Sequence, residues 1–172
     1  MFRKSSSFAV LNVPSLKVRK LINLQGDFSY DALSPDGQTL YLVEHMSSND
    51  VLRYRVRAYD VSAGQLLKKM VTDKRRWQSV MTGVPMARAW SLDSRWAFTL
   101  YGAGANPFVH SLDTRNAYAV CIDLPQRFAK IELGTVGMEM QKGDRLVIKY
   151  RTTGKTLAVL DTKNFRVVST AR

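Results

Sequence analysis

The sequence contains little cysteine and no long hydrophobic run. Cys121 is the one cysteine among 172 residues, which excludes an intramolecular disulfide framework. It lies in the apolar segment AVCIDL, a setting typical of a buried structural thiol rather than a reactive one. No segment approaches the roughly 18 apolar residues that a membrane-spanning helix requires. We therefore expect no membrane span.

Histidine is also scarce, and nucleophile motifs are missing. His45 stands beside Glu44 and His110 stands three positions before Asp113, but no third ligand follows at a metal-binding spacing. We expect both histidines to be polar partners at strand ends, and we predict no metal and no other cofactor. No Gly-x-Ser-x-Gly segment is present, and the loop at 102–105 lacks the Gly-Lys-Ser/Thr ending of a phosphate-binding loop. These features argue against an enzyme.

Acidic residues are few relative to basic ones. The chain has 26 Lys and Arg against 14 Asp and Glu, a formal net charge of +12. This excess favours an anionic partner, whether a nucleic acid, an anionic membrane surface or an acidic protein, and charge alone does not choose among them. Hydrophobic residues make up 45% of the chain, which is enough for a folded core.

The N-terminus lacks the pattern of an export signal. Arg3 and Lys4 are followed by FAVLNV, about six residues, before Pro14 and a basic segment at 17–20. A secretory signal needs a longer apolar core than this. As written, the chain is expected to be soluble, unexported and cytoplasmic.

What the sequence does contain is a repeat. Four segments share one pattern, in which an apolar strand ends at Asp or Asn, a polar turn follows and a second strand begins. The segments are FAVLNVPSLKVRKLINL from Phe8, VRAYDVSAGQLLKKMV from Val56, FVHSLDTRNAYAVCIDL from Phe108 and LAVLDTKNFRVVST from Leu157. The anchoring residues are Asn12, Asp60, Asp113 and Asp161, which are 48, 53 and 48 residues apart. This period predicts a propeller or solenoid, whose units must stack to bury their apolar faces. We expect each Asp to accept hydrogen bonds from backbone N–H groups two residues on, which fixes the turn.

The segments between turns predict an all-β chain. They are short and rich in Val, Leu, Tyr and Phe, and no apolar i, i+3, i+4, i+7 pattern persists for three helical turns. Four strands in a meander make one blade, and Leu66–Met70 is counted as a strand although its residues favour helix. The predicted single domain of residues 1–172 consists of a half blade at 8–27 and four-stranded antiparallel blades at 28–73, 86–125 and 130–170, about three and a half blades in all. Between the first two blades, residues 74–85 are interpreted as a lengthened loop.

The turn and strand motifs resemble a known family. SPDGQTLYL followed by VRAYDVSAGQLL, and later FVHSLDT and LAVLDTKNFRVV, is similar to the repeats of YVTN-type or WD-like β-propeller proteins. The motifs are also similar to those of uncharacterised bacterial propellers of the cell envelope. The resemblance implies a propeller fold, a binding or scaffolding role, and an extracytoplasmic location for a full-length parent. It provides no catalytic residues.

The chain departs from that family in size. Propellers usually have four to eight blades and close into a ring, often by joining the first and last strands in one blade. Here the half blade at 8–27 supplies two late strands, and the last blade also ends on a late strand. We expect either a fragment of a longer propeller or two copies that associate through their open sheet edges.

Two basic features are candidate binding sites. In VLRYRVRAY the strand period of two places Arg53, Arg55 and Arg57 on one face, where guanidinium groups can bind phosphates or carboxylates. The second feature is a loop that combines cations with a stacking ring, as single-strand nucleic-acid binders do. Its residues are Lys74, Arg75, Arg76 and Trp77. The competing interpretation of both features is a solvated face and an ordinary charged loop.

These observations predict a non-catalytic β-propeller repeat module that binds or scaffolds a protein or an anionic ligand. One alternative is a propeller enzyme of the lactonase or quinoprotein kind, built from distant loops. Another is a basic protein that binds nucleic acid or an anionic surface.

Overall fold

The chain folds into antiparallel β-sheets arranged in two compact units. The structure is a computed structural model that describes residues 3–50, 52–102 and 106–170. Unit 1 comprises Met1–Val71 and Ser79–Met81, and unit 2 comprises Thr72–Gln78 and Thr82–Arg172. We describe each unit by itself.

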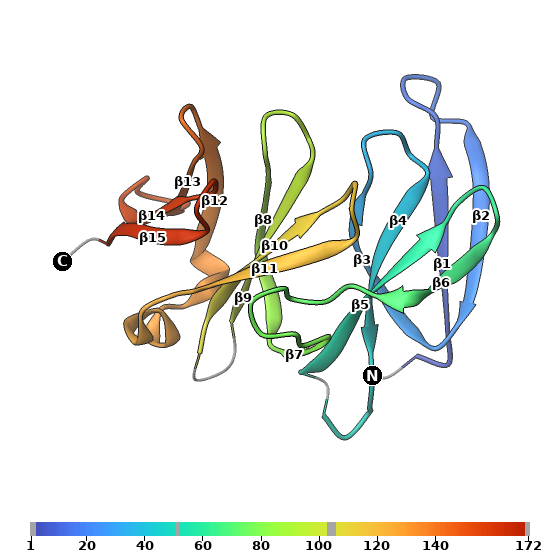
Figure 1. Ribbon diagram of the computed structural model, residues 1–172, viewed down its shortest axis with the longest axis horizontal. Helices are drawn as coiled ribbons and strands as arrows, with labels where there is room; N and C mark the ends of the chain where they lie inside the picture. The colour runs from blue at the N-terminus through green and yellow to red at the C-terminus, as the bar shows by residue number, and fades with distance from the viewer. Residues whose placement is uncertain (1–2, 51, 103–105, 171–172) are drawn as a thin grey trace. The chain divides into compact units, whose positions relative to one another are not determined.

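Unit 1 contains a two-stranded hairpin and one meander of strands (Figure 1). The hairpin consists of β1 (Ser5–Leu11) and β2 (Val18–Gln25). The meander consists of β3 (Asp27–Leu33), β4 (Thr39–His45), β5 (Arg53–Asp60) and β6 (Gln65–Met70), and the short β7 (Val80–Thr82) pairs with β5. Apolar residues that alternate along these strands meet in one core, which includes Val10, Ile22, Phe28, Leu42 and Tyr59.

Unit 2 contains two four-stranded meanders. The first consists of β8 (Val84–Trp90), β9 (Trp96–Gly102), β10 (Phe108–Asp113) and β11 (Tyr118–Asp123). Two 3₁₀ turns, η1 (Gln126–Lys130) and η2 (Leu133–Thr135), lead to the second, which consists of β12 (Val136–Gln141), β13 (Arg145–Tyr150), β14 (Thr156–Asp161) and β15 (Arg166–Thr170). The core of this unit includes Phe98, Val109, Ile122, Phe128, Ile148 and Leu160.

The all-β prediction and the four-stranded blade are confirmed. Each predicted blade appears as one antiparallel meander, and the predicted half blade appears as the β1–β2 hairpin. Leu66–Met70 lies within β6, so its place in the repeat outweighed its helical propensity. Val51, where the sequence places the start of a strand, and residues 103–105 of the glycine-containing loop lie outside the described residues.

The segment at 74–85 differs from the lengthened loop that the sequence predicted. Residues 80–82 form β7, and Asp73 makes a parallel bridge to Ala119 on β11. Backbone hydrogen bonds from Ala119 N to Thr72 O (3.0 Å) and from Lys74 N to Ala119 O (2.9 Å) hold that bridge. The start of this segment therefore pairs with β11, the outer strand of its sheet, and supplies partners for the backbone N–H and C=O groups of Ala119.

The recurring Asp residues anchor a five-residue turn. Asp113 Oδ1 accepts hydrogen bonds from Arg115 N (3.0 Å) and Asn116 N (3.1 Å), and Asp161 Oδ1 is bonded in the same way to the backbone N–H groups of residues 163 and 164. In the turn of Asp60, Oδ1 accepts from Ala63 N at 2.8 Å. These bonds confirm the structural role predicted for the repeated Asp.

Asp113 is the most heavily bonded of these anchors, and it should matter most for stability. Its side chain is fully buried, and Oδ2 accepts from Arg95 Nε (3.1 Å) and Nη2 (2.6 Å). Burial raises the pKa of this carboxyl, but the hydrogen bonds from Arg95 and from the turn outweigh it and hold the pKa below its usual range.

We predict that Asp113→Ala lowers the free energy of unfolding by about 2–3 kcal/mol, because it leaves two turn N–H groups and a half-buried guanidinium without an acceptor. Urea unfolding followed by circular dichroism measures this change. Asp60→Ala, at the same position of a solvent-exposed turn, is the control and should lose less. Equal losses in the two variants would contradict the assignment.

Candidate functional site

The arginine row on β5 is already partnered by a carboxylate. Glu44, opposite Arg55 on β4, accepts hydrogen bonds from Arg55 Nε (2.6 Å) and Nη2 (2.9 Å) and from Arg57 Nη1 (3.0 Å). Burial raises the pKa of Glu44, but these two arginines outweigh it and lower the pKa overall. Arg53 stays exposed at the start of the strand. The structure thus brings Arg55 and Arg57 together on Glu44, inside unit 1, and leaves Arg53 apart from them.

The loop at 74–77 is a further copy of the Asp-anchored turn. Asp73 Oδ1 accepts a hydrogen bond from Arg75 N at 3.0 Å, and Trp77 N donates to Asp73 O at 2.7 Å. Trp77 has φ +54°, in the left-handed region. This copy is hard to recognise in the sequence because its Asp is not followed by a regular blade strand. The signal was nevertheless present, since DKRRW places a large residue four positions after Asp, as DTKNF does at Phe165.

The cations of this loop hold it against unit 2. Lys74 Nζ lies 3.3 Å from the centroid of the Tyr118 ring, a cation–π contact. Arg75 Nη2 donates to Asn164 O at 3.0 Å, and Arg76 forms an ion pair with Asp123. The four candidate residues therefore have different surroundings: three cations contact their own unit, and the Trp77 side chain is 81% exposed.

The position that Trp77 occupies can be compared across five turns. In the turns that begin at Asn12, Asp60, Asp73, Asp113 and Asp161, the fifth residue always has a positive φ, between 51° and 74°. Those fifth residues are Leu16, Gly64, Trp77, Ala117 and Phe165. Left-handed backbone costs a residue with a side chain about 1–2 kcal/mol, and glycine almost nothing. Phe165 packs on the core and on the Trp96 ring, with 4.8 Å between centroids, whereas Leu16 and Trp77 are mainly exposed.

A pocket of about 480 Å³ opens in unit 2 where three turns meet. Trp96, Met140 and Phe165 supply apolar surface, and Lys163 and Asp144 supply charges of opposite sign. The β8–β9 turn that forms one wall is fixed by Ser91 and Asp93, since Ser91 Oγ donates to Asp93 Oδ1 at 2.6 Å. The arrangement is a shallow amphipathic recess without a cluster of catalytic groups.

Cys121 and His110 form a buried neutral pair. Cys121 is 5% exposed and His110 is 1% exposed, and Sγ lies 3.7 Å from Nδ1. Burial lowers the pKa of His110 to about 4, with the nearby Asp73 opposing that shift, and burial also raises the pKa of the Cys121 thiol. A nucleophilic Cys–His pair needs a lowered thiol pKa, so the buried structural thiol expected from the sequence is confirmed.

The second histidine, His45, has a different environment at the end of β4, where Nε2 lies 3.3 Å from Ser29 Oγ. This contact agrees with the expected role of a polar partner at a strand end, whereas the same expectation was wrong for His110, which lies inside β10 with a buried ring. Within the described ranges, no three His, Cys, Asp or Glu side chains gather in a way that could hold a metal ion.

The low pKa of His110 predicts a pH-dependent stability. The unfolded chain takes up a proton near pH 6.5 and the folded chain only near pH 4, so protonation favours unfolding. The free energy of unfolding should fall by up to about 3 kcal/mol as the pH drops from about 6.5 to 4. Urea unfolding at several pH values measures this slope. The slope should flatten in His110→Leu and persist in His45→Gln, and a slope that persists in His110→Leu would assign it to other groups.

Comparison with known proteins shows the fold and no family. No family model matches the chain, and no curated protein matches it in sequence. Among solved structures, the Dos1 propeller matches 98% of this chain and 44% of its own chain, with a TM-score of 0.58 and 9% identity. Hydrazine synthase from Kuenenia stuttgartiensis matches 95% of this chain and 42% of its own, with a TM-score of 0.56 and 20% identity.

At these identities the likeness concerns the fold alone. The chain has a β-propeller-type fold, as an open set of sheets, and it spans less than half the length of either structure. The finer resemblance to YVTN-type or WD-like repeats stays a prediction. In the part of the chain that the structure describes, no helix is long and apolar enough to cross a bilayer.

Proposed function

We propose that this chain is a non-catalytic binding module that docks an acidic partner protein on the Lys74–Trp77 loop of unit 2. The observation that carries the proposal is Trp77, which holds a large ring in solvent at a backbone position that favours glycine. Backbone strain that nothing inside the fold requires is a reason to look for a function outside it. Trp is also the residue type most enriched at the energetic centres of protein interfaces.

The surroundings of Trp77 support a protein partner. Lys74 and Arg75 contact a ring and a backbone carbonyl rather than a carboxylate, so their charges are not neutralised by these contacts. Their positions are fixed, which lowers the entropy lost when a partner docks. Lys74 and Arg75 would attract an acidic protein surface, and the Trp77 ring would be buried against apolar side chains on that surface.

The buried Cys121–His110 pair supports a role without catalysis, because both groups are neutral and shielded from solvent. A nucleic-acid binder is the second candidate, since the same loop combines cations with an exposed ring. It requires several guanidinium groups that are not paired with a carboxylate, and Arg76 is already paired with Asp123. This makes the protein partner the better supported of the two.

We predict that the chain binds a soluble copolymer of glutamate and tyrosine, and that Trp77→Gly weakens this binding by about tenfold or more, as the loss of an interface Trp does. Fluorescence anisotropy of the labelled copolymer at low salt measures it. Stability should not fall in Trp77→Gly, because glycine relieves the left-handed strain. Ala117→Gly makes the same backbone change without removing a ring and should bind like the parent chain.

Unchanged affinity in Trp77→Gly would sink the proposal. Tight binding of single-stranded oligothymidylate, with a steep loss of affinity as salt rises and with weaker binding of the copolymer, would replace the protein partner by a nucleic acid.

A further inference from the structure

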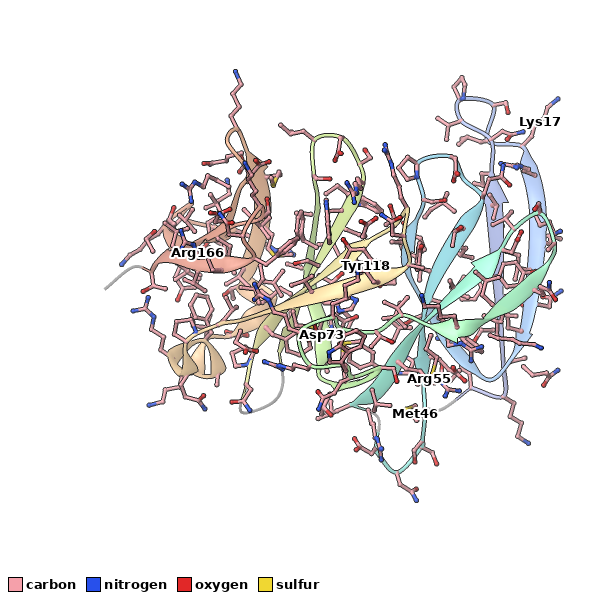
Figure 2. All side chains as sticks on the ribbon, in the orientation of Figure 1. Lys17, Met46, Arg55, Asp73, Tyr118 and Arg166 are labelled. Atoms are coloured by element: carbon pink, nitrogen blue, oxygen red, sulfur yellow. The ribbon has the colours of Figure 1, made fainter. Side chains whose placement is uncertain are left out.

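The turn end of the β1–β2 hairpin carries a group of exposed apolar side chains. This group, the hairpin end, consists of Leu11 (44% exposed), Val13 (84%), Leu16 (68%), Val18 (56%) and Leu21 (68%). The hairpin has two strands and a free edge on either side among the described residues, and its turn is marked by Lys17 (Figures 1 and 2). Five exposed apolar residues within eleven positions form a patch rather than scattered surface residues.

The fold of unit 1 does not use these side chains. Along the hairpin the core is reached by Val10 and Ile22, and the exposed group lies on the other face or in the turn. Leu16 has φ +54°, at the turn position that Gly64 occupies in another turn of unit 1. Glycine at residue 16 would remove both the strain and the exposed side chain. The side chain of Leu16 is therefore unexplained by packing within the chain.

The charged residues of the hairpin and of the segment before it are all basic. Residues 1–26 contain no Asp or Glu, and they contain five basic residues: Arg3, Lys4, Lys17, Arg19 and Lys20. Arg3 forms an ion pair with Asp27, the first acidic residue of the chain. Within the described parts of the chain, Lys17 and Arg19 form no ion pair with a carboxylate. A partner for this end must accept apolar side chains and also supply negative charge.

A second copy of the chain meets the first requirement only. Two hairpin ends placed against one another would bring Lys17 and Arg19 of both copies together, and the hairpin itself carries no carboxylate to offset them. An anionic lipid surface meets both requirements. Apolar side chains enter the boundary between headgroups and acyl chains, while nearby Lys and Arg stay at the level of the phosphates.

We propose that the hairpin end docks on an anionic lipid surface, with Val13 and Leu16 inserted below the phosphates and with Lys17 and Arg19 contacting them. The interaction is peripheral and reversible, since one turn buries few apolar groups and each cation near such a surface adds modestly to binding. The site lies in unit 1 and does not rest on the function proposed for the Lys74–Trp77 loop.

Co-sedimentation of the full chain with vesicles tests this assignment. Vesicles of phosphatidylcholine and phosphatidylglycerol in a ratio of about 3:1 should bind the chain, and pure phosphatidylcholine should bind it at least about tenfold more weakly. Raising the salt concentration should weaken binding to the anionic vesicles. Equal binding to both kinds of vesicle, or to neither, would overturn the proposal.

Two variants separate the apolar and the electrostatic contributions. Val13→Ser with Leu16→Gly should keep the fold, because both positions are exposed and Leu16→Gly relieves strain, and it should lower vesicle affinity by about tenfold or more. Lys17→Gln with Arg19→Gln should lower it by a similar factor. The matched controls are Val168→Ser, an exposed valine on β15, and Lys142→Gln, an exposed turn lysine, and neither should change vesicle affinity.

Light scattering distinguishes the other occupants of this surface. A dimer that Val13→Ser with Leu16→Gly abolishes, together with unchanged vesicle affinity in that variant, would assign the hairpin end to a second copy and overturn the proposal. Binding of the glutamate–tyrosine copolymer that is lost in this variant and kept in Trp77→Gly would move the acidic-protein site to the hairpin and contradict both proposals.

Discussion

The carboxylate at the end of a strand is the constraint on which the rest of this structure depends. In the turns of Asp60, Asp73, Asp113 and Asp161, Oδ1 accepts backbone N–H groups two or three residues on. In three of these turns the fifth backbone N–H donates to the backbone oxygen of the Asp. These bonds close the turn without the help of its fifth side chain, which can therefore vary from glycine to tryptophan. The same device presents Trp77, whereas the Asn12 turn that presents Leu16 is closed by backbone bonds, from Leu16 N to Asn12 O (2.7 Å) and from Asn12 N to Lys17 O (2.9 Å).

The fold was predictable from the sequence because its signals are local. Strand period, turn residues and the recurring Asp all act over a few residues, so the blades appear where the pattern indicates them. The candidate site was predictable only in part. The sequence pointed to residues 74–77, but it does not show which groups their cations contact. Asn164, which accepts a hydrogen bond from Arg75, lies 89 residues further along the chain. Glu44 was missed for the same reason, since its contact with Arg55 depends on the register between β4 and β5.

The net charge of +12 is not spread as one binding face. Arg55 and Arg57 share the carboxylate of Glu44, and Arg76 is paired with Asp123. A row of arginines in a sequence is thus weak evidence for an anion site, because a neighbouring strand can supply the anion. The hairpin end differs because no acidic residue precedes Asp27. The location of carboxylates, more than the count of cations, determines where this chain can attract an anion.

Trp77 and Leu16, the two proposed binding residues with a left-handed backbone, are best understood by comparison with Phe165. Phe165 has the same left-handed turn position as Trp77 and Leu16, and its ring contacts Trp96 and the core of unit 2. Its strain is therefore offset inside the fold. The side chains of Trp77 and Leu16 are mainly exposed instead. Since the backbone cost is similar at all three positions, Trp77 and Leu16 are the two of them for which we propose a partner outside the chain. Because the two residues belong to separate units, each proposal can fail without affecting the other.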